Sequence, residues 1–194
     1  TIYDEEGTPL RVVGLLRNIH AQKVEQQKLL IRAETDQMTG LYNKATTESK
    51  IQASLRELNG NSYQVLMLVD IDDFKKINDT FGHDQGDKAI QIVCEILNDI
   101  FQTHAVIGRL GGDEFGIAFT CKNEDFIIHI DSLIQERTQY FNEKYQLPYY
   151  VSLSYGISVF DYNSPFDLNH TIRLADSLMY ERKKEKHLQR GKKG

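Results

Sequence analysis

Two acidic residues follow a pair of glycines near the middle of the chain, between two apolar runs. The segment reads Arg109-Leu110-Gly111-Gly112-Asp113-Glu114-Phe115, and the flanking runs Ala105 to Ile107 and Phe115 to Phe119 predict the strands of a β-hairpin. Gly111 and Gly112 suit the turn, because glycine adopts left-handed conformations and leaves bare backbone that a phosphate can approach. Mg²⁺ is typically held by one or two carboxylates together with substrate phosphates. The turn therefore predicts half of a metal-nucleotide site, with solvated acids on a tight hairpin as the alternative.

A second acidic pair, Asp70 and Asp72, ends an almost continuous apolar run that starts at Gln64. Such a run predicts a strand buried on both faces. Carboxylates at the mouth of a buried strand are costly unless something pairs them, and a metal ion is the simplest partner. A surface turn with solvated acids is the alternative interpretation.

Apolar periodicity predicts the elements around these two segments. A helix with Ile51, Leu55 and Leu58 on one face follows Gly40, and a turn at Asn59-Gly60-Asn61 ends it. Polar and glycine residues crowd Asp73 to Asp87. The pattern then predicts a helix striped by Ile90, Val93, Leu97 and Ile100, a helix from about Glu124 to Tyr140, a strand near Tyr149 to Phe160, and a last helix with Leu168, Ile172, Ala175 and Met179. Gly191 to Gly194 are predicted to form a disordered tail.

The composition limits the kinds of partner. A chain of 194 residues can hold one full domain plus an attachment, and its net charge of -5 argues against nucleic-acid binding. Cys94 and Cys121 are too few for a disulfide framework or a zinc site, which favours a reducing cytoplasm. No apolar run reaches transmembrane length and no signal peptide is visible, so no membrane contact is expected from this segment. Because the chain starts at Thr1 without methionine, we expect it to be part of a longer protein, whose own membrane attachment is left open.

The first 35 residues are predicted to form two separate pieces. Residues 1–19 show β-prone runs around a turn at Asp4 to Gly7 and resemble the last two strands of a PAS sensor domain, whose exit triplet matches Asn18-Ile19-His20. A truncation remnant is the alternative. Residues 20–35 predict a helix with a thin apolar seam, which we interpret as a signalling linker that pairs two chains, a lone solvated helix being the alternative.

Five motifs occur in order along the rest of the chain: DQMTGLYNK, DIDDFKKINDTFGHDQGD, RLGGDEF, SLSYGIS and ADSLMYERK. Over residues 36–187 they resemble the GGDEF family of diguanylate cyclases, and residues 188–194 are left as a tail. The resemblance implies an α/β (α+β) fold with a central, mostly antiparallel sheet flanked by helices, similar to nucleotide cyclases and polymerase palms. It also implies condensation of two GTP molecules into cyclic di-GMP with release of pyrophosphate, in a homodimer that holds one GTP per protomer.

The resemblance also assigns the metal and catalytic positions. Asp70, Asp113 and the carbonyl of Ile71 match the metal ligands, and hard oxygen atoms suit Mg²⁺ or Mn²⁺, with two ions per site. Two metals would activate the 3′-hydroxyl of one GTP and stabilise charge on the α-phosphate of the other. Asp113 or Glu114 would accept the hydroxyl proton, and the sequence leaves open which.

The substrate contacts follow from the same resemblance. Lys75 and Lys183 match positions near the phosphates, where Lys75 would stabilise the transition state, and Asn78 and Asp87 match the positions that read guanine. A carboxylate at residue 87 can accept the protons on guanine N1 and N2, whereas N1 of adenine is itself an acceptor. Two further contacts are implied at Phe74 and His83, with core packing and a turn hydrogen bond as the respective alternatives.

Two departures from the family pattern bear on activity and regulation. His187 stands where the family has a phosphate-binding Arg, and Lys184 or Lys186 could compensate. Gln102 to Ala105 replace the RxxD of the product-inhibition site, so we expect no inhibition by cyclic di-GMP there. A GTP-binding regulatory domain without turnover and a polymerase-like nucleotidyl transferase are the competing hypotheses, and the acidic charge disfavours the second.

Overall fold

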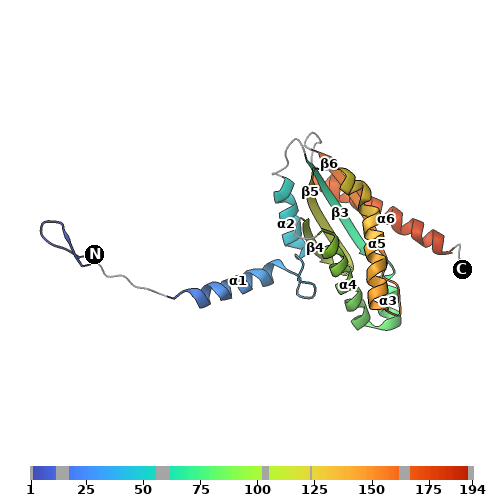
Figure 1. Cartoon of the computed structure of the whole chain (residues 1–194), viewed down its shortest axis with the longest axis horizontal. Helices are drawn as coiled ribbons and strands as arrows, with labels where there is room; N and C mark the ends of the chain where they lie inside the picture. Colours follow the sequence, from blue (N-terminus) through green and yellow to red (C-terminus); the bar gives the residue numbers. More distant parts are fainter. Residues whose placement is uncertain are drawn as a thin grey trace. The chain divides into compact units, whose positions relative to one another are not determined.

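The described part of the chain consists of two units. The structure, a computed structural model, describes residues 2–11, 18–55, 62–101, 105–122, 124–161 and 167–191. One unit is Thr1–Ala33 and the other is Glu34–Gly194; their helices and strands are labelled in Figure 1. The predicted turn at Asn59 to Asn61 and the predicted replacement of the inhibition site at Gln102 to His104 lie outside the described residues. Over these described ranges, no helix has the length and apolar character needed to cross a membrane.

The first unit contains a short hairpin and most of helix α1. Strands β1 (Ile2–Tyr3) and β2 (Pro9–Arg11) pair antiparallel. The carboxylate of Asp4 closes the turn between them, because it accepts hydrogen bonds from the backbone N–H groups of Glu6 (3.0 Å) and Thr8 (2.7 Å). Helix α1 (His20–Glu34) has no buried residue. The predicted turn and helix are confirmed, and the PAS-like origin of the hairpin stays a prediction.

A four-stranded antiparallel sheet forms the centre of the second unit. Its strands, in spatial order, are β4 (Ala105–Gly111), β5 (Glu114–Cys121), β3 (Tyr63–Ile71) and β6 (Leu153–Asp161). Every residue of β3 after Tyr63 is buried, as the apolar run predicts. With this sheet flanked by helices, the predicted α/β fold with an antiparallel sheet is confirmed.

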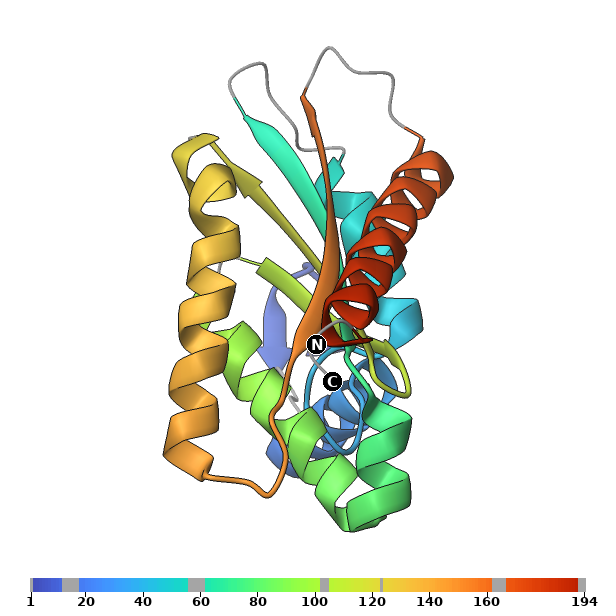
Figure 2. The same ribbon diagram turned by 90° about the vertical axis from the view of Figure 1, so that its right-hand side faces the viewer.

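Helices cover both faces of the sheet (Figures 1 and 2). The larger core lies between one face and helices α4 (His83–Phe101) and α5 (Glu124–Tyr145), and Val65, Met67 and Val69 of β3 belong to it. Leu66 and Leu68 point to the opposite face, which helices α2 (Lys44–Leu55) and α6 (Leu168–Gly191) cover. Because side chains alternate along a strand, β3 contributes to both cores.

Helix α3 (Phe74–Phe81) is the one described element between Asp73 and Asp87 that the apolar pattern does not predict. Phe74, Ile77 and Phe81 recur at helical spacing in it, but the helix has only eight residues and lies among polar and glycine residues. The helix packs against α4 and ends at Gly82, whose φ of 89° lies in the left-handed region that suits glycine. The polar segment after β3 is therefore helical, and α3 presents its polar side chains near the end of that strand.

The boundaries of α5, β6 and α6 also differ from those predicted. Helix α5 continues to Tyr145, and β6 begins at Leu153 rather than Tyr149. The carboxamide of Asn142 in α5 bonds both the N–H (2.7 Å) and the C=O (2.8 Å) of Val151, so this backbone pairs with a side chain instead of a strand. Helix α6 extends to Gly191, so residues 188–191 of the predicted tail belong to this helix.

Candidate active site

Strand pairing brings the two acidic segments together. In the β3–β5 pair, Asp70 lies directly opposite Glu114, and the N–H of Ile71 donates a hydrogen bond to the carbonyl of Asp113 (3.3 Å). Directly opposed side chains lie on the same face of a sheet, with Cβ atoms about 5 Å apart. Acids from two distant parts of the sequence therefore meet at one end of the sheet.

Arg109 holds the turn between β4 and β5. Its guanidinium donates hydrogen bonds to the carbonyl of Gly112 from Nε (3.0 Å) and Nη2 (2.8 Å), while Nη1 lies 3.2 Å from the carboxylate of Asp36. Gly112 has a φ of 53°, in the left-handed region where a side chain would be strained. The turn that presents Asp113 is thus held by glycine geometry and by a side chain of the same motif.

Asp36 connects the chain after α1 to this hairpin. Burial alone would raise the pKa of Asp36, but hydrogen bonds from the hydroxyl (2.7 Å) and N–H (3.0 Å) of Thr39, together with Arg109, lower it. The backbone of Tyr42 donates to Ile107 (3.2 Å) and accepts from Arg109 (2.9 Å), which attaches the segment to β4. The Asp36–Arg109 pair was not predicted, although both residues lie in recognised motifs and carry opposite charges.

The carbonyl of Ile71 points toward the hairpin. A trans peptide unit is planar, with its C=O and N–H groups in opposite directions. The N–H of Asp72 donates to the carbonyl of Ser152 (2.8 Å), on the β6 side of β3. The carbonyl of Ile71 belongs to the same peptide unit and therefore faces the β5 side, where Asp113 lies. Among the described residues, neither Gly112 nor Asp113 donates a backbone hydrogen bond to this carbonyl.

Besides the Asp72–Lys186 pair, the described residues at this end of the sheet include three acidic side chains, and one lysine pairs with one of them. Asp70 is buried, and its carboxylate bonds the ammonium of Lys183 on α6 at 2.6 Å. Burial raises the pKa of Asp70; Lys183 opposes this rise, and the charge of Asp113 adds to it. Asp113 is half-buried and Glu114 is exposed. This surplus of negative charge favours a bound cation.

A divalent ion fits this donor set. Carboxylates and a backbone carbonyl are the hard oxygen ligands that Mg²⁺ and Mn²⁺ prefer. Among the residues described here, no group of three or more His, Cys, Asp or Glu side chains could hold a metal by itself. Such a partial set is typical of Mg²⁺, which takes further oxygen ligands from water and substrate phosphates. The proximity of Asp70, Ile71 and Asp113 supports their predicted role as ligands, which stays a proposal.

Asp72 has protein partners of its own. Its carboxylate accepts hydrogen bonds from the hydroxyls of Ser152 and Ser154 (2.5 Å each) and from the ammonium of Lys186 (2.8 Å). Burial alone would raise the pKa of Asp72, but these donors lower it. The interpretation that a metal pairs the acids at the end of β3 is therefore wrong for Asp72. The position of Asp72 in the sequence, two residues after Asp70, gave no indication that Lys186 of α6 would pair with it.

Close packing of α6 on β6 positions Lys183. A Cβ atom at Gly156 would lie only 1.9 Å from the carbonyl oxygen of Ala175 in α6, so a larger residue would push the helix away. Ala175 and Met179 pack with Leu68 of β3, on the same side of α6 as Lys183. The apolar contact between α6 and the sheet therefore continues into the Lys183–Asp70 ion pair.

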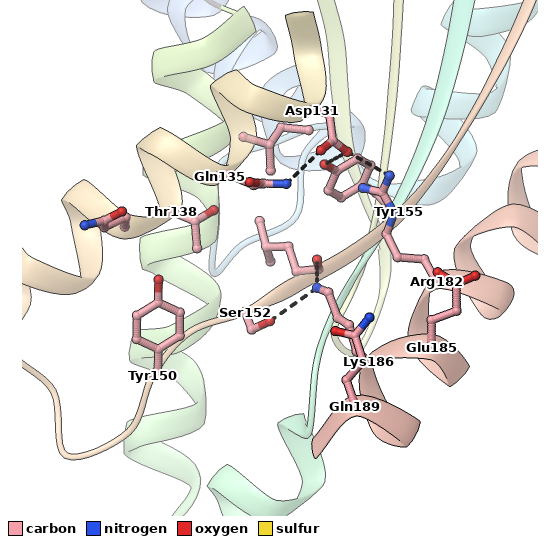
Figure 3. A pocket seen from close by; sticks show the side chains of 13 residues that line it. Asp131, Gln135, Thr138, Tyr150, Ser152, Tyr155, Arg182, Glu185, Lys186 and Gln189 are labelled. Carbon is pink, nitrogen blue, oxygen red and sulfur yellow. Dashed lines mark hydrogen bonds and ion pairs between the residues drawn. The ribbon is translucent and has the colours of Figure 1, made fainter. Parts of the chain in front are cut away.

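A pocket of about 490 Å³ lies beside α6, with walls from α5, β6 and α6 (Figure 3). The guanidinium of Arg182 lies 3.8 Å from the ring centroid of Tyr155 and pairs with Asp131 of α5 at 2.7 Å. Lys186 of α6 lines the pocket, and its ammonium donates a hydrogen bond to the hydroxyl of Ser152 (3.3 Å; Figure 3). These contacts connect all three elements at the β6 edge of the sheet.

The predicted guanine-reading residues lie where α3 meets α4. The side chain of Asn78 rests against the backbone of Gly86, because a Cβ atom there would come within 2.0 Å of Asn78 Oδ1. Asp87 follows Gly86 directly, so the structure brings these two predicted residues together. The side chains of Lys75, His83 and Asp87 are exposed and form no hydrogen bond or ion pair among the described residues, which leaves them available to a ligand.

The sequence leaves two interpretations of Phe74, a contact to the nucleotide and packing in the core. Phe74 is half-buried and packs against the larger core. The packing alternative is therefore supported, while the exposed part of the ring leaves room for a base.

Comparison with known proteins identifies the family. The family described as "Diguanylate cyclase, GGDEF domain" matches residues 33–189. The chain is 34% identical over 163 residues to diguanylate cyclase DgcP of Escherichia coli K12, which covers 81% of the chain and 47% of that protein. It is 31% identical over 154 residues to probable diguanylate cyclase DgcT of the same strain, which covers 78% of the chain and 34% of that protein. The chain belongs to the GGDEF family of diguanylate cyclase domains.

Solved structures agree on the fold. The coiled coil and GGDEF domain of DgcB from Caulobacter crescentus, in complex with c-di-GMP, matches with a TM-score of 0.71 at 20% identity, over 86% of this chain and 89% of that one. The chain spans less than half the length of the two curated relatives.

Proposed function

We propose that this chain is a metal-dependent diguanylate cyclase that joins two GTP molecules into cyclic di-GMP. The observation that carries the proposal is the meeting of Asp70, Asp113 and the carbonyl of Ile71 at one end of the sheet. Lys183 supplies a cation beside them. The names of the two relatives, both diguanylate cyclases or probable ones, support the same reaction.

The reaction consists of two equivalent nucleotidyl transfers. In each, the 3′-oxygen of one GTP forms a bond to the α-phosphorus of the other, the bond from that phosphorus to the β-phosphate oxygen breaks, and pyrophosphate leaves. Two Mg²⁺ or Mn²⁺ ions would lower the pKa of the 3′-hydroxyl and neutralise charge on the phosphates. Asp113 or Glu114 accepts the hydroxyl proton. Lys75 and Lys183 stabilise the negative charge that develops on the phosphates.

Base selection falls to the residues between α3 and α4. Asp87 accepts the protons of guanine N1 and N2, and Asn78, positioned against Gly86, contacts the same base. Phe74 and His83 complete the contacts to the nucleotide, and Gly111 and Gly112 allow its phosphates to approach the backbone.

The reaction requires two copies of the chain, because each site holds one GTP. Helix α1 exposes Leu29 and Leu30, each 56% exposed, and we propose that it pairs with α1 of a second copy. The hairpin before it would be the end of a PAS-like sensor that controls this pairing. Because GTP is the substrate, the enzyme would act in the cytoplasm.

A regulatory domain that binds GTP without turnover is the second candidate. His187 is exposed and replaces the phosphate-binding Arg of the family pattern. Lys186 could not compensate while it holds Asp72 and Ser152. Lys184 lies with its ammonium 4.3 Å from the ring centroid of Tyr180, on the exposed side of α6.

One experiment separates the two candidates. The protein is incubated with GTP and either Mg²⁺ or Mn²⁺, the product is identified by mass, and pyrophosphate is quantified. We expect cyclic di-GMP and two pyrophosphates per product. Binding of GTP without pyrophosphate would establish the regulatory function, and absence of both binding and product would overturn both candidates.

A further inference from the structure

The buried carboxylate of Asp72 is the most completely paired acid at the site. Its side chain is only 3% exposed, and three donors reach it: Ser152 Oγ, Ser154 Oγ and Lys186 Nζ. Lys186 in turn bonds Ser152 Oγ (3.3 Å) and the carbonyl oxygen of Leu153. A carboxylate buried among so many donors cannot leave them without a large cost in free energy. Asp72 is therefore held by the protein and is not offered to a metal.

The two lysines of α6 differ in how they are held. The ammonium of Lys183 bonds one oxygen, on Asp70, whereas the ammonium of Lys186 bonds three, on Asp72, Ser152 and Leu153. A single ion pair can be exchanged for a metal ion or a phosphate with little rearrangement. Lys186 has three oxygen partners, and one of them belongs to the backbone of β6. It therefore connects α6, β6 and the end of β3 in a fixed arrangement.

The position of Asp72 controls the orientation of the proposed metal ligand beside it. The carbonyl of Ile71 and the N–H of Asp72 belong to one planar peptide unit. That unit is fastened through the N–H to Ser152 (2.8 Å) and through the Asp72 side chain to Ser154 and Lys186. Loosening the side chain would let the peptide rotate, and the carbonyl of Ile71 would no longer face Asp113.

We propose that Lys186 is a positioning residue, which fixes Asp72 and so aims the carbonyl of Ile71 at the metal site while keeping the Asp72 carboxylate out of it. The proposal rests on the proposed cyclase function for its catalytic consequence. Its structural part concerns only metal binding and peptide orientation, and it can be tested on a protein without turnover.

The test compares Lys186→Met with Arg173→Met, a control that removes an exposed cation of the same helix. Binding of Mn²⁺ in the presence of a non-reacting GTP analogue is measured by electron paramagnetic resonance, and amide exchange of Asp72 is measured by NMR without metal. For Lys186→Met we expect Mn²⁺ affinity to fall by about tenfold, which corresponds to about 1.4 kcal/mol, and exchange of the Asp72 amide to accelerate. Turnover should fall with a larger effect on kcat than on KM for GTP. Lys186→Arg, which keeps the charge, should recover part of the metal affinity.

The outcomes separate the two proposals. Unchanged Mn²⁺ affinity and Asp72 exchange in a folded Lys186→Met would overturn the positioning role, even if its melting temperature falls. If Lys186→Met does not fold, Ser154→Ala decides, because it removes one donor to Asp72 without leaving an unpaired lysine. A wild-type protein that binds Mn²⁺ and GTP but releases no pyrophosphate would overturn the cyclase function and leave the positioning test intact.

Discussion

At the scale of the residue, the site consists of acids with different partners. Asp70 meets one lysine and keeps a raised pKa because it is buried beside other acids. Asp72, two residues away, is completely paired by two hydroxyls and a lysine. Asp113 is carried by a turn that Arg109 holds. Identical side chains therefore have different chemistry, because the strand places each against different donors.

Asp113→Ala tests the proposed metal site. Without this carboxylate the negative charge that attracts the metal is reduced, and we expect pyrophosphate release at saturating GTP and Mg²⁺ to fall by about a thousandfold or more. Glu136→Ala is the control, because Glu136 is exposed on α5, away from the site. Turnover by Asp113→Ala at the wild-type rate would refute the assignment of Asp113.

Asp87→Ser tests the reading of the base. A serine hydroxyl can donate as well as accept, so it tolerates the acceptor at adenine N1 that a carboxylate rejects. We expect the preference for GTP over ATP to fall by about tenfold or more in a competition with both nucleotides, read from the products by mass. Asp84→Ser, on an exposed position of the same helix, should keep the wild-type preference. An unchanged preference in Asp87→Ser would exclude this role.

At the scale of the element, the site depends on contacts between whole helices and strands. The β3–β5 register brings Asp70 opposite Glu114, the Asp36 segment is bonded to β4, and α6 lies against β6 at Gly156. Each contact positions a functional side chain that its own element could not position alone. Packing defects away from the acids should therefore reduce activity.

Gly156→Ala tests the packing of α6. The added methyl would overlap the carbonyl of Ala175, which belongs to the helix backbone and cannot move alone. We expect the free energy of unfolding to fall by about 1–3 kcal/mol and turnover to fall because Lys183 shifts from Asp70. Gly116→Ala is the matched control, since the atoms nearest to its added methyl would be side-chain carbons of Leu110 at 3.2 Å or more, and this side chain can shift. Urea unfolding and pyrophosphate release measure both effects; equal losses in the two variants would contradict the packing argument.

At the scale of the whole molecule, acids that tie elements together make stability depend on pH. Burial opposes ionisation of Asp36 and Asp131, but their hydrogen-bond donors prevail and lower the pKa of each carboxyl. Asp36 joins the segment after α1 to the hairpin, and Asp131 joins α5 to Tyr155 and Arg182. A group with a lowered pKa in the folded state stabilises the fold above its unfolded pKa and loses that effect as the pH falls.

The free energy of unfolding should therefore decrease as the pH falls below the ordinary aspartate value of 3.8. Urea denaturation at a series of pH values between neutrality and about pH 3 measures this dependence. In Asp36→Asn the amide cannot ionise, so the decrease should be shallower than in the wild type. An Asp36→Asn profile parallel to that of the wild type would show that the Arg109 pair contributes nothing to the pH dependence.

Product inhibition is a further property of the whole molecule. The RxxD positions of the family read Gln102 to Ala105, which lack its Arg and Asp. Added cyclic di-GMP should therefore leave the initial rate unchanged at concentrations well above that of the enzyme. A falling rate that Gln102→Ala restores would contradict this prediction.

The sequence by itself determined the family, the buried strand β3, the hairpin and the charged residues of the candidate site. Apolar runs, glycine pairs and the order of the motifs encode these features locally. They can be recognised in the sequence without knowing which strands pair. The short helix α3 was not predicted, because its apolar residues at helical spacing extend over only eight residues within a polar, glycine-containing segment.

Only the tertiary structure showed that one acid of β3 has a single lysine partner while the other is held by three donors. The family motif distinguishes Asp70 from Asp72 as a metal ligand, but it does not show their protein partners, Lys183 and Lys186, which lie more than 100 residues further along the chain and approach from α6. The direction of the Ile71 carbonyl likewise follows from a hydrogen bond between Asp72 and Ser152. Long side chains and peptide planes are oriented by strand register and helix packing, which periodicity along one segment does not contain.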